Sequence, residues 1–247
     1  MIAYAQTDIG RGRRINQDSI FASAAPVGPF PNLFIVADGM GGHKAGDFAS
    51  RFLVERLSGF IKDSTETDVV TVLRKAIERV NYLLYQEAMQ NPDRSGMGST
   101  LVAATVSGGM MYVVNVGDSR LYLFRDELKQ ITRDHSLVEA MVSLGKMERN
   151  SESYESQKNI ITRAVGIESE VEPDFFEVPL RKRDCVLLCS DGLTNMMEDS
   201  AISRILRSGD SLEQKTKSLI AGANENGGRD NIAVILAEPG ASEVRLC

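Results

Sequence analysis

Short apolar segments alternate with longer amphipathic ones along the chain. Six of the short segments are rich in β-branched residues, and several are bounded by Gly or Asp, so they predict buried strands. They cover residues 32–37, 100–106, 110–116, 120–124, 185–189 and 231–237. The pair Gly108-Gly109 leaves only a tight turn between two of them, which predicts an antiparallel hairpin.

The amphipathic segments predict helices. Across residues 67–89, apolar residues return every three or four positions, as on one face of a long helix. Weaker patterns predict helices at 45–61, 136–144, 199–207 and 212–223. Helices therefore come in pairs between groups of strands, which favours an α+β class with layered sheets and helices. The polar stretch 146–159 is expected to leave the core as an exposed excursion and is a candidate flap.

Composition narrows the classes of function. The 247 residues are 43% apolar, which suffices for a sizeable core, and no repeat or Pro/Gly/Ser-rich linker divides them, so one domain is predicted. A formal net charge of -6 provides no basic surface for nucleic acid or anionic lipid. The apolar runs are too short to cross a bilayer, and the first ten residues lack a secretory pattern. We expect a cytoplasmic protein without nucleic-acid or membrane partners.

The available ligands favour hard cations. Cys185 and Cys189 fall within one apolar segment and are interpreted as small buried hydrophobic residues. The chain has only two histidines, His43 and His135, and the second is expected to order a loop. Oxygen ligands are plentiful, so the composition favours Mg²⁺ or Mn²⁺ over Zn²⁺.

Four aspartates stand at the ends of apolar segments. Asp38, Asp118 and Asp191 follow such segments, and Asp230 precedes one. Strands of one sheet can bring their ends to a common rim, where gathered carboxylates repel one another unless cations neutralise them. Neighbouring glycines would allow sharp turns there and carbonyl ligands. An isolated Asp-Gly pair usually marks a turn, so the set carries the inference. Two bridged cations can hold a hydroxide in line with phosphorus, which points to phosphoester hydrolysis.

The motifs around these aspartates resemble those of the PPM family, the metal-dependent protein phosphatases similar to protein phosphatase 2C, in its compact bacterial form. The resemblance spans nearly the whole chain. In the family's order, the matching landmarks are Arg13, Asn16-Gln17-Asp18, Ala37-Asp38-Gly39-Met40-Gly41-Gly42-His43, Gly98-Ser99-Thr100, Val116-Gly117-Asp118-Ser119-Arg120, Asp134-His135-Ser136, Thr162-Arg163-Ala164, Ser190-Asp191-Gly192-Leu193 and Gly228-Arg229-Asp230-Asn231.

The resemblance implies a fold and an activity. The fold is a four-layer α-β-β-α sandwich, with two antiparallel sheets face to face, helices outside and a flap subdomain. The catalytic domain would cover 1–240, with the flap at about 136–166 and a tail at 241–247. The activity is hydrolysis of phosphoserine and phosphothreonine in proteins by a metal-bridging hydroxide. The expected substrates are a cognate Hanks-type serine/threonine kinase and its targets, and a monomer is expected.

The resemblance also assigns metal ligands. Asp38 would bridge two Mn²⁺ or Mg²⁺ ions, and the Gly39 carbonyl would ligate one of them. Asp191 and Asp230 would complete the other position. Asp118, with Asp191, matches a third and weaker metal site.

Further roles fall on residues around these ligands. Asp18 would hold metal-bound water, and Arg13 would receive the substrate phosphate, for which a planar, permanently charged guanidinium is suited. Where eukaryotic relatives have a histidine after the bridging Asp-Gly, this chain has Met40, so the general acid stays unassigned. His43 is a candidate acid or a hydrogen-bonded loop residue, and Asn231 is a candidate for acid catalysis or for a position behind the ligands.

Two other functions compete with a general phosphatase. A catalytically silent relative that binds phosphoproteins would be expected to have lost ligands that this chain retains. A regulatory phosphatase acting on one small anti-sigma antagonist is the second alternative, and the lack of a fused sensor segment favours a general enzyme over it. The flap is either a substrate-selecting element or a flexible solvent loop.

Overall fold

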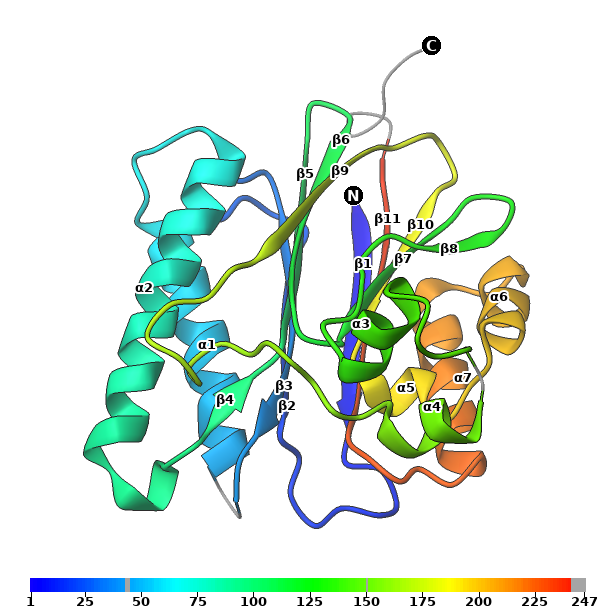
Figure 1. The fold of residues 1–247 in the computed structure, drawn as a ribbon. Coiled ribbons are helices and arrows are strands. Elements are labelled where there is room, and N and C mark those ends of the chain that lie inside the picture. Colours follow the sequence, from blue (N-terminus) through cyan, green and yellow to red (C-terminus); the bar gives the residue numbers. More distant parts are fainter. Residues whose placement is uncertain (43–44, 150, 241–247) are drawn as a thin grey trace.

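Two antiparallel sheets form the centre of the molecule in this computed structural model, which describes residues 1–42, 45–149 and 151–240 (Figure 1). The first sheet has the order β1 (Ile2–Asp8), β11 (Ile232–Glu238), β10 (Cys185–Cys189), β7 (Arg120–Phe124), β8 (Leu128–Gln130). The second has the order β2 (Asp18–Ser23), β3 (Leu33–Met40), β5 (Leu101–Ser107), β6 (Met110–Val116), β9 (Asp174–Pro179), and β4 (Gly98–Ser99) pairs with the end of β3.

Helices cover the outer face of each sheet. The long helices α1 (Ala45–Lys62) and α2 (Val69–Gln90) pack on the second sheet, with the short η1 (Pro92–Arg94) after them. The helices α5 (Asp191–Thr194), α6 (Asp199–Arg207) and α7 (Leu212–Glu225) cover the first sheet. The helices α3 (Leu137–Ser143) and α4 (Glu152–Gln157) follow β8, and residues of α4 and of α5 line one cavity. The predicted α+β sandwich of four layers is therefore confirmed.

Three apolar cores hold these layers together. One lies between α1, α2 and the second sheet, where Leu53 and Ile77 are fully or almost fully buried. The second lies between the two sheets and includes Val36 and Ile235. The third lies between the first sheet and its helices. Because both faces of each sheet are covered, central strands such as β3, β5 and β11 are continuously apolar, which is why the sequence predicted them.

The structure corrects the sequence predictions at the sheet edges. The sequence predicted six strands, and the structure adds β1, β2, β8, β9 and the short β4. The strands β1 and β9 are partly exposed and mix polar with apolar residues, so they lack the continuous apolar run of the others. The predicted hairpin at Gly108-Gly109 is present, and both glycines have positive φ, as a two-residue turn between twisted strands requires.

The candidate flap contains regular structure. Helix α4 lies within the polar stretch that was expected to be an exposed excursion. The Tyr154 hydroxyl donates to Glu139 on α3 (3.0 Å), and both terminal nitrogens of Arg149 donate to the same carboxylate (2.6 Å each). The two flap helices are thus joined to each other. None of the helices in the described part of the chain has both the length and the apolar character needed to span a membrane.

Candidate active site

Five aspartates meet at one end of the paired sheets. Asp18 and Asp38 stand directly opposite each other on β2 and β3. Asp191 follows β10 and begins α5, Asp230 lies just before β11, and Asp118 lies between β6 and β7. The two sheets therefore contribute carboxylates to one buried cluster, in which each charge acts on several others.

Burial and mutual repulsion oppose ionisation of this cluster. Burial, followed by the charges of neighbouring aspartates, raises the pKa of Asp38 well above its ordinary value. Burial is also the main cause that raises the pKa of Asp18 and of Asp118 to about 8 and that of Asp191 to about 6. After burial, the charges of Asp18 and Asp191 contribute most to the raised pKa of Asp38, so these three carboxylates repel one another.

The donor set of the cluster suits divalent cations. As the described side chains stand, no three His, Cys, Asp or Glu residues form a ready ligand set for one metal ion. However, Asp18 Oδ1 and Asp191 Oδ1 are buried acceptors without a hydrogen-bond partner in the described residues. A buried oxygen without a donor is costly, and a hard cation is the partner that carboxylate oxygens prefer. The residues present therefore fit Mg²⁺ or Mn²⁺.

Glycines next to the aspartates permit a sharp turn in one place and close contact of backbones in two others. Gly117, before Asp118, has a positive φ of 102° in the turn between β6 and β7, as was expected. β3 continues to Met40, so Asp38 and Gly39 lie inside the strand. A Cβ atom on Gly39 would lie 1.9 Å from the Gly46 carbonyl oxygen, and one on Gly192 would lie 1.9 Å from that of Asn231. The pairing of β3 with α1, and of α5 with β11, therefore excludes any larger residue there.

Hydroxyl groups fix the backbone of Asp38. The Asp38 N–H donates to Thr100 Oγ1 (3.0 Å), and the Ser99 hydroxyl donates to the Asp38 carbonyl (3.0 Å). Thr100 Oγ1 also contacts the Ser119 hydroxyl at 2.7 Å, next to Asp118. Thr100 and Ser119 lay in motifs that the sequence singled out, but their hydroxyl contacts could not be found from pattern alone.

Ser190 connects the two sheets beside the cluster. Its side chain is fully buried, its hydroxyl donates to Asp18 Oδ2 (2.7 Å), and its oxygen accepts the Ala233 N–H (2.9 Å). Asp18 belongs to the second sheet, whereas Ala233 belongs to β11 of the first and Ser190 directly follows β10 of the first. Sequence reasoning missed this role, and the only signal was the position of Ser190 immediately before Asp191.

Arg13 faces the cluster from the loop after β1. Its Nη2 lies 2.6 Å from Asp230 Oδ2. Burial alone would lower the pKa of this guanidinium, but the hydrogen bond and charge of Asp230, followed by the charges of Asp38 and Asp191, raise it. Arg13 therefore stands among the aspartates rather than in solvent alone.

Asn231 holds the loop that carries Arg13. Its amide donates to the carbonyls of Ile9 (2.9 Å) and Ile15 (3.1 Å), and its Oδ1 accepts the Gln17 N–H (2.8 Å). Asn231 is 3% exposed, so these hydrogen bonds are shielded from solvent. All three hydrogen bonds are made with the loop between β1 and β2, so Asn231 holds this loop in place.

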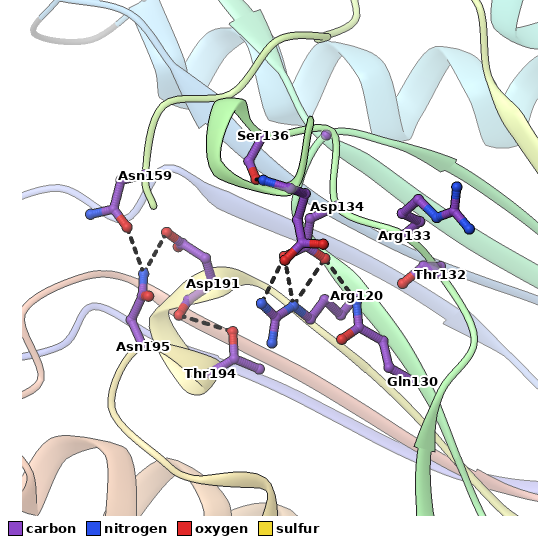
Figure 2. A network of polar contacts seen from close by, with 12 residues as sticks. Arg120, Gln130, Thr132, Arg133, Asp134, Ser136, Asn159, Asp191, Thr194 and Asn195 are labelled. Carbon is purple, nitrogen blue, oxygen red and sulfur yellow. Dashed lines mark hydrogen bonds and ion pairs between the residues drawn. The ribbon is translucent and has the colours of Figure 1, made fainter. Parts of the chain in front are cut away.

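A polar network surrounds the other side of the cluster (Figure 2). Arg120 binds Asp134 through Nε (3.0 Å to each oxygen) and Nη2 (2.7 Å), and Gln130 donates to the same carboxylate (2.8 Å). Asn195 donates to Asp191 Oδ2 (2.8 Å) and to Asn159 of the flap (3.3 Å). A cavity of about 290 Å³ between these groups adjoins Asp118 and Asp191. The flap thus contacts the cluster through Asn195.

His135 is buried beside the loop that carries Asp118. His135 is 7% exposed, and its Nδ1 accepts the Gly117 N–H (3.2 Å). Its Nε2 lies 3.3 Å from Asp174 Oδ2, so this nitrogen carries the proton. His135 therefore orders the loop next to Asp118. His43 lies outside the described residues.

Comparison with known proteins identifies relatives along nearly the whole length of the chain. The family model described as protein phosphatase 2C matches residues 9–237. The serine/threonine phosphatase stp of Listeria welshimeri is 43% identical over 248 residues, 96% of each chain. The protein phosphatase PhpP of Streptococcus pneumoniae is 39% identical and covers 93% of this chain and 94% of its own. The crystal structure of Stp1 from Staphylococcus aureus is 34% identical, with a TM-score of 0.89 and coverage of 97% and 95%.

Proposed function

This chain belongs to the protein phosphatase 2C family and is a serine/threonine protein phosphatase, and we propose that its aspartate cluster holds the divalent cations on which the family depends. The observation that carries the proposal is the convergence of Asp18, Asp38 and Asp191 with two buried carboxylate oxygens that lack donors in the described residues. Cation charge would relieve both the repulsion and the unsatisfied oxygens.

The placement of each residue supports the proposed ligands. Asp38 stands opposite Asp18 in the sheet and interacts with the charge of Asp191, so it is the candidate bridge, with the Gly39 carbonyl beside it. Asp191 and Asp230 would complete the core positions, for Mn²⁺ or Mg²⁺. When bound, such cations activate water as a nucleophile at neutral pH and neutralise charge on the phosphoryl group.

A third and weaker cation position is proposed at Asp118 and Asp191. The charge of Asp191 acts directly on Asp118, and the polar cavity under the flap adjoins both carboxylates. Asp18 would stand behind the ligands and orient water, with Ser190 holding one of its oxygens in place.

Arg13 is the proposed phosphate-binding residue. Its guanidinium now binds Asp230 and is about half exposed, with a relative side-chain accessibility of 48%. If Asp230 held a cation, its attraction for Arg13 would weaken, and the Arg13 guanidinium would be available to the oxygens of a substrate phosphate. A guanidinium there stabilises charge that develops on the phosphoryl oxygens during transfer.

The proposal also covers the domain bounds, the location, the oligomeric state and the substrates of the protein. We infer that residues 1–240 act as one catalytic domain with residues 136–166 as its flap, and that the protein is a cytoplasmic monomer. Its natural substrates would include a Hanks-type serine/threonine kinase and the targets of that kinase. The segment 241–247 lies outside the described residues.

Phosphate release from a phosphothreonine peptide tests the metal assignment. The wild type is expected to be active with Mn²⁺ or Mg²⁺ and inactive in EDTA, and Asp38→Ala and Asp191→Ala should each lose at least about 10²-fold in kcat. Asp126→Ala, a carboxylate in the turn between β7 and β8, is the matched control and should stay active. Full activity of Asp38→Ala would contradict the assignment. Silence of the wild type on several phosphopeptides would instead support a phosphoprotein-binding module.

A further inference from the structure

A groove of about 770 Å³ lies between the end of β3 and the segment that leads from the flap to β9. Part of its lining is apolar and part is acidic. The residues that matter here are Met40, Ile167 and Val171 on the apolar side and Glu168, Glu170 and Glu172 on the acidic side. We call it the acidic groove. None of these six residues is a proposed metal ligand or the proposed phosphate-binding residue.

The acidic groove begins close to the aspartate cluster. Met40 lies two residues after Asp38 on β3. Alternate residues of a strand share one face, so both side chains point to the same side of the sheet. Two residues of extended chain span about 7 Å, which is also the distance between alternate residues of a bound peptide. A phosphorylated residue at the cluster would therefore place its near neighbours in the groove.

The acidic side of the groove is held in a fixed position. Val165 and Ser99 exchange two backbone hydrogen bonds (3.0 and 2.8 Å), which attach the segment to β4. Asn81 on α2 is 1% exposed, accepts the Gly166 N–H (2.7 Å) and donates to the Glu168 carbonyl (3.0 Å). A groove that is already ordered loses little entropy when a ligand binds.

The charge of the groove is negative. Arg163 also lines it, but its guanidinium donates to Asp174 (3.2 Å) and to the Glu172 carbonyl (3.2 Å), so its charge is matched by Asp174. Within the described part of the chain, the carboxylates of Glu168 and Glu170 form no ion pair. Both are exposed to solvent. The groove therefore complements a basic ligand that also carries an apolar side chain.

We propose that the acidic groove binds the part of the substrate chain next to the phosphorylated residue, and that the enzyme prefers phosphoproteins with Lys or Arg and a bulky apolar residue there. This inference rests on the proposed phosphatase function and adds a substrate class to it. The apolar side chain would cover Ile167, which is 41% exposed, and the basic side chain would face Glu168 and Glu170.

Four phosphothreonine peptides of equal length test the preference in the wild type. They carry basic or acidic residues beside the phosphothreonine, each combined with leucine or glycine. The basic peptide with leucine should exceed the acidic peptide with leucine by about tenfold in kcat/KM, mainly through KM, and the difference should shrink at high salt. Equal kcat/KM for all four peptides would overturn the proposal.

Paired variants assign the preference to the groove. Glu168→Gln/Glu170→Gln should reduce the preference for basic peptides to about threefold or less. The control Glu127→Gln/Glu213→Gln removes two exposed charges elsewhere and should keep it. An undiminished preference in the first double variant would overturn the proposal.

Hydrolysis of a small aryl phosphate distinguishes failure of the groove proposal from failure of the proposed phosphatase function. Such a substrate reads out the catalytic site alone, because it is too small to reach the acidic groove. If the wild type hydrolyses neither the aryl phosphate nor any peptide, the phosphatase assignment itself fails, and the groove proposal fails with it. If the aryl phosphate is hydrolysed but the peptides show no preference, only the groove proposal is overturned.

Discussion

Replacing Ser190 by alanine should destabilise the fold and weaken metal binding without removing a metal ligand. The Ser190 hydroxyl makes two buried hydrogen bonds, to Asp18 Oδ2 at 2.7 Å and from the Ala233 N–H at 2.9 Å. Asp18 Oδ1 already has no donor in the described residues. Ser190→Ala would also remove the hydroxyl that donates to Oδ2.

The magnitude follows from the two groups that lose their partner. Without metal, the pKa of Asp18, raised by burial to about 8, leaves this carboxyl mostly neutral at pH 7. A hydrogen bond between neutral groups contributes about 0.5–1.5 kcal/mol, and a buried N–H without a partner costs about 1–3 kcal/mol. The free energy of unfolding should therefore fall by about 2–4 kcal/mol, a large part of the stability of a typical domain. Because Ser190 holds one oxygen of Asp18, which is proposed to stand behind the metal ligands, the metal concentration for half-maximal activity should rise by about 10–100-fold.

Urea unfolding followed by circular dichroism, with EDTA, measures the first effect, and a Mn²⁺ titration of peptide hydrolysis measures the second. Ser58→Ala is the matched control, since Ser58 donates only to carbonyls within its own helix (2.8 Å to Val54), and it should change stability by less than about 0.5 kcal/mol. A loss below about 1 kcal/mol for Ser190→Ala would refute the reasoning, because the sheets would then not depend on this bridge.

Three further predictions concern groups outside the cluster. Burial lowers the pKa of His135, so the folded state disfavours its charged form, and the contribution of His135 to stability should fall as the pH drops from about 7 through the folded pKa; because the raised pKa values of the aspartate cluster have the opposite effect, the measurement is the difference in urea midpoint between the wild type and His135→Gln across this range. Burial raises the pKa of Cys185 and Cys189 to about 12, so in a protein whose third cysteine is replaced by serine, a disulfide reagent at pH 8 should label neither thiol until urea unfolds the chain. Arg125→Ala leaves the fully buried Asp184 carboxylate without its bidentate partner (2.8 and 2.7 Å), and the free energy of unfolding should fall by about 3–5 kcal/mol in the same urea assay.

The sequence predicted the parts of the fold whose residues are buried on both sides. Strands β3, β5 and β11 are continuously apolar because sheets and helices cover both of their faces. By contrast, β1 and β9 have a partly exposed face, and polar residues there conceal the strand pattern. Local sequence cannot show which exposed segments pair, because pairing depends on residues more than a hundred positions away, as when β1 pairs with β11.

The candidate site was predictable to a similar extent. Four of the five aspartates were found because each stands at one end of an apolar run, a local signal that does not require knowledge of the fold, whereas Asp18 was found only through the family resemblance. Ser190 and Asn195 were missed because their roles depend on which groups face them after folding: Asp18 from the other sheet for Ser190, and the flap for Asn195. Asn231 was a candidate for acid catalysis or for a position behind the ligands, and its three contacts with the loop between β1 and β2 could be seen only in three dimensions.

The position of the cluster couples folding to catalysis. Asp18 and Asp38 belong to one sheet, whereas Asp191 and Asp230 follow or precede strands of the other, so the carboxylates repel one another across the contact between the sheets. Ser190 and Asn231 cross the same contact with hydrogen bonds that oppose this repulsion. Loss of either bridge should therefore let the sheets separate at the end where the proposed ligands must meet. Stability and metal affinity should consequently fall together in variants of these two residues, whereas variants of the acidic groove should change neither.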